Sequence, residues 1–251
     1  MSLQQRYKTE KAKWDDIAEK HLEGLGVLDP GQDFHKYSLD EIKLTGASAF
    51  LGDLHRKRVL EIGCGTGLIS VLLAKSGAHV TSFDLSPLSV QATKRRAEIN
   101  DVNIDPLVSA GEHLPFANES FEIVFGKSIL HHLDPHVGGL EIARVMSKGG
   151  KAVFVEPMGM NPVLTFVRQH LPYQHKNPVG VDQPLTYRDM DTWTQNFSSR
   201  NYREVQLLSM IERGFGWHRQ FKALRKLDDI LLKYIPFLRR FCRYVVITAI
   251  K

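Results

Sequence analysis

The stretch Val59-Leu60-Glu61-Ile62-Gly63-Cys64-Gly65-Thr66-Gly67 decides the fold. Residues 58–62 form a short apolar run after a basic loop, which is typical of a buried strand. The glycines form a turn, and residues 67–76 then predict a helix, closed by Gly77 where a C-terminal cap is expected. In an open α/β sheet this turn lies at the carboxyl edge of the strands, where ligands bind. Glycines there let a ligand approach the backbone, because no Cβ stands in its way.

Strands and helices alternate over the next hundred residues. This spacing predicts βαβ units and a parallel sheet, so the expected fold class is α/β, doubly wound. The further strands of this part are expected at residues 79–83, 105–109, 121–125 and 151–156, with helices at residues 87–100 and 139–146.

Both ends of the chain follow other patterns. Residues 157–184 hold five prolines and little periodicity, which predicts a long loop without regular structure. Thr186 with Asp189 three residues later predicts the start of a helix. The remaining expected elements are helices at residues 11–22, 39–51 and 216–234 and strands at residues 202–210 and 244–250.

The residues around the glycine turn indicate which ligand it binds. Asp84 ends the next strand, where its carboxylate can accept hydrogen bonds from both hydroxyls of a ribose, and Leu85 can pack on a flat base. A nicotinamide or flavin dinucleotide is disfavoured, because the spacing is G-x-G-x-G rather than G-x-G-x-x-G. Glu61 stands two residues before the first glycine, and a carboxylate so close to the turn would disfavour a diphosphate but suit a sulfonium or ammonium group. The pattern favours a nucleoside with a cationic amino-acid tail.

The E-x-G-C-G-T-G sequence followed by an acidic strand end resembles motif I of the class I S-adenosylmethionine-dependent methyltransferases. Residues 84–87 resemble the family's ribose-binding strand end, and residues 111–116 its adenine-side loop. Residues 121–133 resemble the fourth-strand motif with its His-His-Leu tail, and residues 145–151 the turn before the fifth strand. The resemblance is to the small-molecule, type 11 branch of the family.

This resemblance implies a Rossmann-like, mostly parallel seven-stranded sheet with a helical N-terminal cap and a C-terminal helical insert. We expect one domain over residues 1–251. Its expected parts are a cap (1–57), a cofactor-binding core (58–157), a substrate lid (158–185) and C-terminal helices with the last strands (186–251).

The implied cofactor is S-adenosylmethionine, with S-adenosylhomocysteine as product. Many relatives place an aspartate before the small residue of the adenine loop; this chain has Ala110 there, so Glu112 or a backbone carbonyl would take that contact, or stacking would replace it. The expected cofactor-binding residues are Glu61, Gly63, Cys64, Gly65, Gly67, Asp84, Leu85, Gly111, Glu112 and Lys127, the last through its backbone carbonyl.

Histidine suits the general base that a hydroxyl or acidic C–H acceptor would require. His131 and His132 follow the fourth strand; each is either a base or a packed residue bonded to the backbone, and adjacent histidines are expected to point apart. Glu156 is either catalytic or a structural acceptor for the Pro-rich segment. That segment is either a solvated loop or a lid from which His170, His175 or Tyr173 reaches inward. No further ligands stand at zinc spacing, so no metal is expected.

The composition sets further expectations. The chain has 251 residues, a formal charge of +5 and two cysteines, and no apolar run suits a membrane span or a secretory signal. We therefore expect a reducing compartment, the cytoplasm. Much of the positive charge lies in the amphipathic helix near residues 219–243, which could pack on the sheet, roof the substrate pocket or contact an anionic membrane.

The expected function is methyl transfer from S-adenosylmethionine to a small molecule by in-line displacement. One alternative is an RNA or DNA methyltransferase, which the positive charge favours but the motifs after the fourth strand do not. Another is a non-catalytic subunit that binds S-adenosylmethionine. His35 and Tyr37, in the cap, are a possible lid contact. The acceptor, the methylated atom and the oligomeric state stay open.

Overall fold

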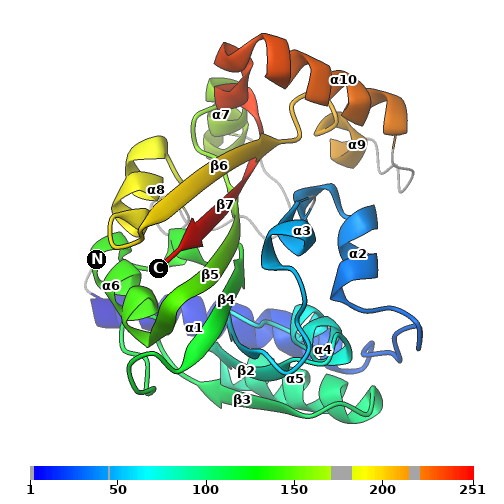
Figure 1. Ribbon diagram of the computed structural model, residues 1–251, viewed down its shortest axis with the longest axis vertical. Coiled ribbons are helices and arrows are strands. Elements are labelled where there is room, and N and C mark those ends of the chain that lie inside the picture. Colours follow the sequence, from blue (N-terminus) through cyan, green and yellow to red (C-terminus); the bar gives the residue numbers. More distant parts are fainter. Residues whose placement is uncertain (1–2, 45, 171–182, 215–220) are drawn as a thin grey trace.

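A seven-stranded sheet forms the centre of the computed structural model, which describes residues 3–44, 46–170, 183–214 and 221–251. The strand order is β3-β2-β1-β4-β5-β7-β6, and β7 alone runs antiparallel to its neighbours. This confirms the predicted α/β, mostly parallel fold (Figure 1). The strands are β1 (Arg58–Ile62), β2 (His79–Asp84), β3 (Ile104–Val108), β4 (Phe121–Lys127), β5 (Met146–Pro157), β6 (Ser199–Val205) and β7 (Tyr244–Ile250).

The central strands are buried on both faces, which explains their continuous apolar sequences. Leu60 and Ile62 pack in one core cluster, with Trp193, while Val59 points to the opposite face and packs with Phe34. Alternate residues of one strand thus enter two separate cores.

Helices cover both faces of the sheet, and polar caps begin several of them. Ser86 and Asp134 accept hydrogen bonds from backbone N–H groups of the first turns of α5 and α6. The capping box predicted at Thr186 and Asp189 is present at the start of α8. These helices are α4 (Leu68–Lys75), α5 (Pro87–Ile99), α6 (Pro135–Val145) and α8 (Tyr187–Thr194).

The N-terminal region begins with one long helix, α1 (Leu3–Leu22), which is longer than predicted. The single helix predicted over residues 39–51 is wrong, because the backbone there is interrupted twice. Glu41 is extended, and Gly46 has φ 85° in the left-handed region. Three short segments result: α2 (Phe34–Asp40), η1 (Ile42–Leu44) and α3 (Ala47–Leu51).

The C-terminal half departs from the prediction in several elements. Residues 162–170 form a helix rather than an irregular loop, and the Asn161 side chain caps it by accepting from the N–H groups of Val163 and Leu164. The strand predicted at 202–210 ends at Val205, because Asp228 takes the following backbone N–H groups. The additional helices are α7 (Pro162–His170), α9 (Ile211–Gly214), α10 (Lys222–Tyr234) and η3 (Pro236–Phe241).

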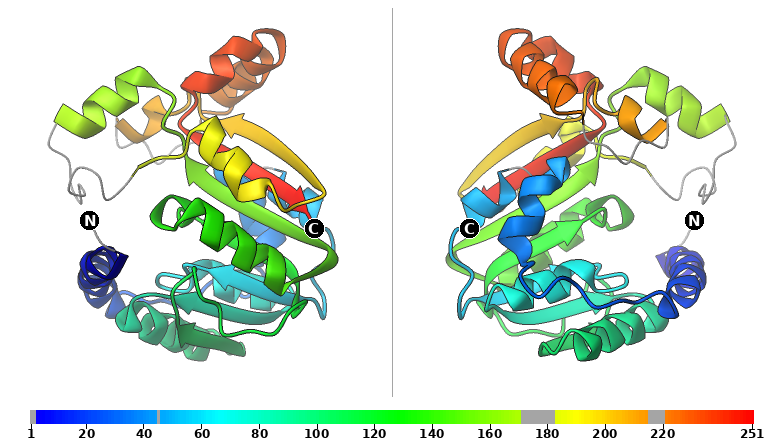
Figure 2. Two further views of the ribbon diagram at one scale, coloured as in Figure 1. Left: turned by 90° about the vertical axis from the view of Figure 1, so that its left-hand side faces the viewer. Right: turned by 90° about the vertical axis from the view of Figure 1, so that its right-hand side faces the viewer.

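These C-terminal helices gather at one end of the molecule (Figures 1 and 2). Pro157, at the end of β5, pairs with Tyr244, at the start of β7. The segments that follow β5 and precede β7 therefore leave the sheet at its carboxyl edge, on the same side as the glycine turn after β1. No helix among the described residues is long and apolar enough to cross a membrane.

Candidate active site

A cavity of about 230 Å³ opens at the carboxyl edge of β1, β2 and β4. It contains every expected cofactor-binding residue except Gly67. Its lining residues are Tyr7, Glu10, Trp14, Glu61, Gly63, Cys64, Gly65, Thr66, Leu68, Ile69, Phe83, Asp84, Leu85, Ser109, Ala110, Gly111, Glu112, Lys127, Ser128, Ile129, His132 and Leu133.

The three glycines of the turn have left-handed backbone angles but different surroundings. A Cβ on Gly63 would lie 2.8 Å from the Ile129 side chain, and one on Gly67 would lie 2.7 Å from the Cα of Thr93. A Cβ on Gly65, with φ 53°, would meet nothing within 4 Å. Gly65 is therefore the glycine whose backbone a ligand can approach, whereas Gly67 lets helix α4 pack against α5.

Asp84 is 8% exposed and anchored by two backbone groups. Its Oδ2 accepts from Gly65 N–H at 2.9 Å, and its Oδ1 accepts from Ser86 N–H at 3.0 Å. Burial raises the pKa of this carboxyl. Each carboxylate oxygen can accept a second hydrogen bond, so the group is held in place and can still bind two hydroxyls at the cavity.

Glu61 lies deeper in the same cavity and is 3% exposed. The Ser70 hydroxyl donates to its carboxyl group. Burial raises the pKa of Glu61 to about 8, and the nearby Asp84 adds to the shift. A carboxyl group in this state takes up a cationic ligand by losing its proton. Burial also lowers the pKa of Lys127, which lines the same region.

Cys64 lines the cavity between two glycines, but its thiol is not reactive. Burial raises its pKa well above the ordinary value, with Asp84 and Glu61 adding to the shift. A thiol in this state stays protonated, and the side chain fills space.

Helix α1 forms one wall of the cavity, which the sequence interpretation missed. Tyr7, Glu10 and Trp14 line the cavity from this helix. Their spacing of three and four residues places them on one helix face, and this was the available signal. His35 and Tyr37, the expected cap contacts, do not line the cavity; His35 instead bonds the Ser48 hydroxyl.

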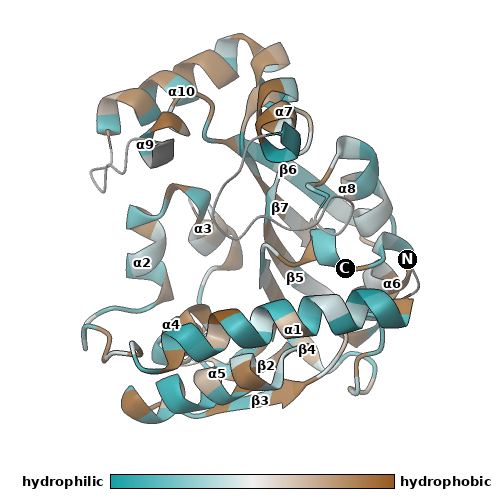
Figure 3. Ribbon diagram, turned by 180° about the vertical axis from the view of Figure 1, so that it is seen from behind, coloured by the Kyte–Doolittle hydropathy of each residue, from teal (hydrophilic) through white to brown (hydrophobic). Residues whose placement is uncertain are grey.

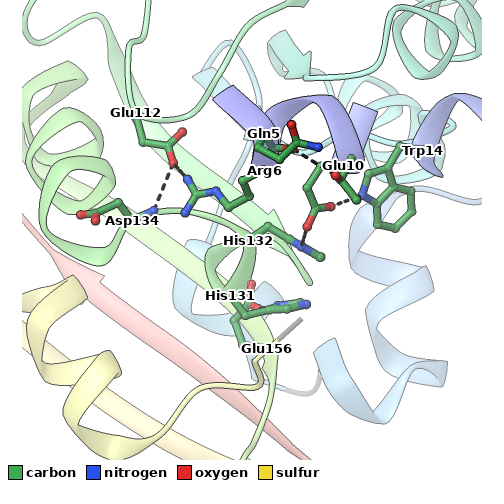
Figure 4. Close-up of polar contacts among 10 residues, drawn as sticks. Gln5, Arg6, Glu10, Trp14, Glu112, His131, His132, Asp134 and Glu156 are labelled. Atoms are coloured by element: carbon green, nitrogen blue, oxygen red, sulfur yellow. Dashed lines mark hydrogen bonds and ion pairs between the residues drawn. The ribbon is translucent and has the colours of Figure 1, made fainter. Parts of the chain in front are cut away.

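Glu10 connects α1 to the segment after β4 (Figure 4). Its Oε1 lies 2.9 Å from His132 Nδ1, and its Oε2 accepts from Trp14 Nε1 at 3.1 Å. Burial alone would raise the pKa of Glu10, but the hydrogen bonds from His132 and Trp14 bring it below its ordinary value. Of the predicted catalytic residues that the structure describes, His132 lines the cavity, and its Nδ1 is committed to Glu10.

Glu112 connects α1 to the opposite wall. Its carboxylate forms an ion pair with Arg6 and accepts from Asp134 N–H at 3.1 Å (Figure 4). It also accepts from the Tyr7 hydroxyl at 2.7 Å. Both oxygens thus serve these contacts, although the residue lines the cavity as expected.

A third polar contact fixes the far part of α1. The Ser86 hydroxyl donates to Asp15 Oδ1 at 2.5 Å, and Leu88 N–H donates to the same oxygen at 3.4 Å. Helix α1 is thus tied at three points along its length to segments that surround the cavity.

Glu156 and His131 lie behind the cavity wall rather than on it. Glu156 is fully buried; its Oε1 accepts from Ile129 and Leu130 N–H, each at 2.9 Å, and its Oε2 lies 2.6 Å from His131 Nδ1. Glu156 is thus an acceptor for the segment after β4, whereas the structural alternative expected from the sequence assigned it to the Pro-rich segment. The expectation that the two histidines point apart is wrong, since the His131 and His132 ring centroids are 4.1 Å apart.

Of the two histidines expected in a lid, the structure describes His170, which does not line the cavity. His170 is exposed on α7, where its ring stacks on Phe166 with centroids 4.4 Å apart. Tyr173 and His175 lie outside the described residues. Among the residues that are described, no group of three or more His, Cys, Asp or Glu side chains could hold a metal ion.

Comparison with known proteins identifies the domain. Residues 60–154 match the sequence profile of the family described as "Methyltransferase domain". This part of the chain is a methyltransferase domain. Its fold is also that of geranyl diphosphate C-methyltransferase from Streptomyces coelicolor, with a TM-score of 0.65, 18% identity, and 98% of this chain and 97% of that one covered.

Curated relatives of this methyltransferase domain include ubiquinone biosynthesis O-methyltransferases. The protein from Cereibacter sphaeroides (strain ATCC 17029 / ATH 2.4.9) is 29% identical over 159 residues, which cover 61% of this chain and 64% of the relative. The protein from Alkalilimnicola ehrlichii is 25% identical over 236 residues, covering 90% and 89%. The similarity therefore spans less than two thirds of the length of the Cereibacter sphaeroides protein.

Proposed function

We propose that the chain binds S-adenosylmethionine and transfers its methyl group to a small molecule. The observation that carries this proposal is the pair of buried carboxyl groups at the glycine turn. Asp84 is positioned for two hydroxyls, and Glu61, with a pKa of about 8, lines the cavity where a cationic amino-acid tail would lie. A diphosphate would meet two carboxyl groups there, so the pair favours the sulfonium nucleoside.

The residues of the chain would divide the binding between them. Asp84 holds the ribose, Leu85 packs on the base, and the open backbone at Gly65 faces the nucleoside. Glu61 and the Lys127 carbonyl hold the ammonium group. When bound, S-adenosylmethionine supplies an electrophilic methyl group on its sulfonium. The protein aligns the acceptor with that methyl group and excludes water, and α1 covers the cavity for this purpose.

We propose positioning roles for three predicted catalytic residues. Glu156 holds His131 and caps the turn after β4, while His132 holds α1 through Glu10. Where the acceptor must lose a proton, it either loses that proton without help from these three residues or transfers it to a residue of the C-terminal segments. His170, which is exposed at the end of α7, is one residue of these segments that could take the proton.

The proposal of a small-molecule acceptor rests on the relatives. They are named for ubiquinone biosynthesis and for C-methylation of geranyl diphosphate. We also propose a cytoplasmic location, which the free, buried thiols of Cys64 and Cys242 support, since a reducing compartment preserves them.

Turnover tests this proposal. The chain is incubated with S-adenosylmethionine and a panel of prenylated phenols, prenyl diphosphates and amines, and S-adenosylhomocysteine is measured by mass spectrometry. We expect product with at least one class, and loss of product in Asp84→Ala but not in Asp105→Ala, an exposed aspartate on the neighbouring strand. Cofactor binding without product for any acceptor would favour the non-catalytic subunit.

A further inference from the structure

Helix α10 and the following η3 carry an exposed surface that is both apolar and basic. Ile230 is 46% exposed, Tyr234 72% and Phe237 63%. Leu227 and Ile230 continue with Tyr234 along one helix face at spacings of three and four residues. We call this surface the basic–apolar face; it comprises Leu227, Ile230, Tyr234, Ile235 and Phe237 with the exposed cations Lys222, Lys226, Lys233, Arg239 and Arg240.

The fold itself turns these apolar residues outward. Asp228, on the opposite side of α10, is 2% exposed and accepts hydrogen bonds from Leu207, Leu208 and Ser209 N–H and from the Ser209 hydroxyl, at 2.7 to 3.1 Å. Leu231, on that inner side, packs against the core. Asp228 therefore fixes the rotation of α10 about its axis, and no small adjustment can bury Ile230.

The charge of the face is strongly one-sided. Between residues 222 and 241 the exposed cations number five, whereas Asp229 is the one exposed acid. Asp229 lies 3.7 Å from Arg203, which partly neutralises it. Aromatic rings stand beside the cations: Lys233 lies 5.4 Å from the Tyr234 ring centroid, and Arg240 lies 5.6 Å from that of Phe237.

The basic–apolar face lies at one end of the long axis of the molecule, at the carboxyl edge of the sheet (Figure 1). Helix α7 projects from the same end (Figures 2 and 3). It adds Val163 and Phe166, which are 68% and 58% exposed. A flat surface can contact this end without obstruction by the sheet, whose β3 edge lies at the other end of the molecule.

These features indicate what covers the face. A second copy of the chain would place the same five cations against each other, which is unfavourable. An anionic bilayer matches both the charge and the apolar side chains of the face. Its headgroups attract Lys and Arg, while apolar and aromatic side chains enter the headgroup region. We propose that the basic–apolar face binds the surface of anionic lipid bilayers.

Vesicle co-sedimentation of the full chain tests this proposal. The vesicles are phosphatidylcholine with or without 30% phosphatidylglycerol. We expect binding to the anionic vesicles, weakening at least tenfold between about 50 and 500 mM salt, and little binding to uncharged ones. Absence of binding to anionic vesicles at low salt, or equal binding to both kinds, would overturn the proposal.

Two variants locate the binding on the chain. Ile230→Asp and Lys226→Glu should each weaken vesicle binding about tenfold. Leu140→Asp is the matched control, because Leu140 is 56% exposed on α6, away from the face. Unchanged thermal unfolding checks that the variants fold, and equal binding by all of them would contradict the assignment. Self-association that Ile230→Asp abolishes, without vesicle binding by the wild type, would assign the face to a second copy instead.

Discussion

Helices α1 and α10 both lie outside the sheet near its carboxyl edge, yet they face it in opposite ways. Helix α1 turns Tyr7, Glu10 and Trp14 towards the cavity and is mainly hydrophilic on its outer side (Figure 3). Helix α10 turns Leu227 and Ile230 towards solvent. Each helix is oriented by buried carboxylates. Glu112 accepts from Tyr7 of α1, and Glu10 of α1 binds His132. Asp228 of α10 accepts from the backbone that follows β6.

In both helices, a few buried polar contacts decide which side of an amphipathic helix is exposed. Hydrophobic burial alone does not choose between the two sides of α10, because both carry apolar residues: Leu231 packs on the core and Ile230 is exposed. A buried carboxylate that loses its partners costs more than one apolar side chain left in water, so the polar anchor prevails. In α1 the anchors serve the cavity, and in α10 they leave an apolar surface free for a partner.

The largest effect is expected when the α10 anchor is removed. Asp228→Ala leaves three backbone N–H groups and a hydroxyl without their acceptor, which should lower the free energy of unfolding by about 3 kcal/mol. Urea denaturation measures the change. The neighbouring Asp229→Ala, at an exposed position, should change it by less than about 0.5 kcal/mol. Similar effects of both substitutions would mean that Asp228 does not anchor the helix.

Removing an α1 anchor should act on the cavity instead. Glu112→Ala removes the partner of Arg6 and Tyr7, so binding must then also order α1. This cost should lower the affinity for S-adenosylmethionine about 10- to 30-fold, or about 1.4–2 kcal/mol. Calorimetry measures the affinity, with Glu98→Ala on the outside of α5 as control. Vesicle binding should be unaffected. Unaltered cofactor affinity would show that α1 is not part of the site.

A pH titration sharpens the comparison further. Below pH 8 the Glu61 carboxyl holds a proton, which it must lose to pair with the ligand's ammonium group, so cofactor affinity should rise roughly tenfold between pH 6.5 and 8. Glu61→Gln should remove that part of the dependence. Vesicle binding should stay constant over the same range, since Lys and Arg keep their charge. A wild-type profile identical to that of Glu61→Gln would contradict the role of Glu61.

Strand positions could be predicted from the sequence because local pattern determines them. The ranges predicted for β1 and β7 match the structure, and the box at Thr186 and Asp189 forms as expected. The helix predicted at 39–51 failed at Gly46, where the left-handed backbone breaks a regular apolar spacing. Helix α7 was missed because prolines flank it and its apolar residues point to solvent.

The cavity likewise has one part that the sequence predicts and one part that it does not. Its floor follows β1 and β2 and could be predicted, because short connections place Gly65 beside Asp84. Its wall could not, since the contacts of α1 join residues far apart in the chain. Glu112 lies 105 positions from Tyr7 and His132 lies 122 from Glu10, and no periodicity records such pairs. The anchoring role of Asp228 depends likewise on where α10 returns to the sheet.

Calorimetry of S-adenosylmethionine with the wild type and Asp84→Ala tests the central claim most directly. We expect binding by the wild type and a loss of about 30- to 1,000-fold in the variant, since a charge-assisted contact to two hydroxyls contributes about 2–4 kcal/mol. Asp105→Ala, on β3, should bind as the wild type does. No binding by folded wild-type protein, or equal binding by Asp84→Ala, would contradict the assignment of the cavity to this cofactor.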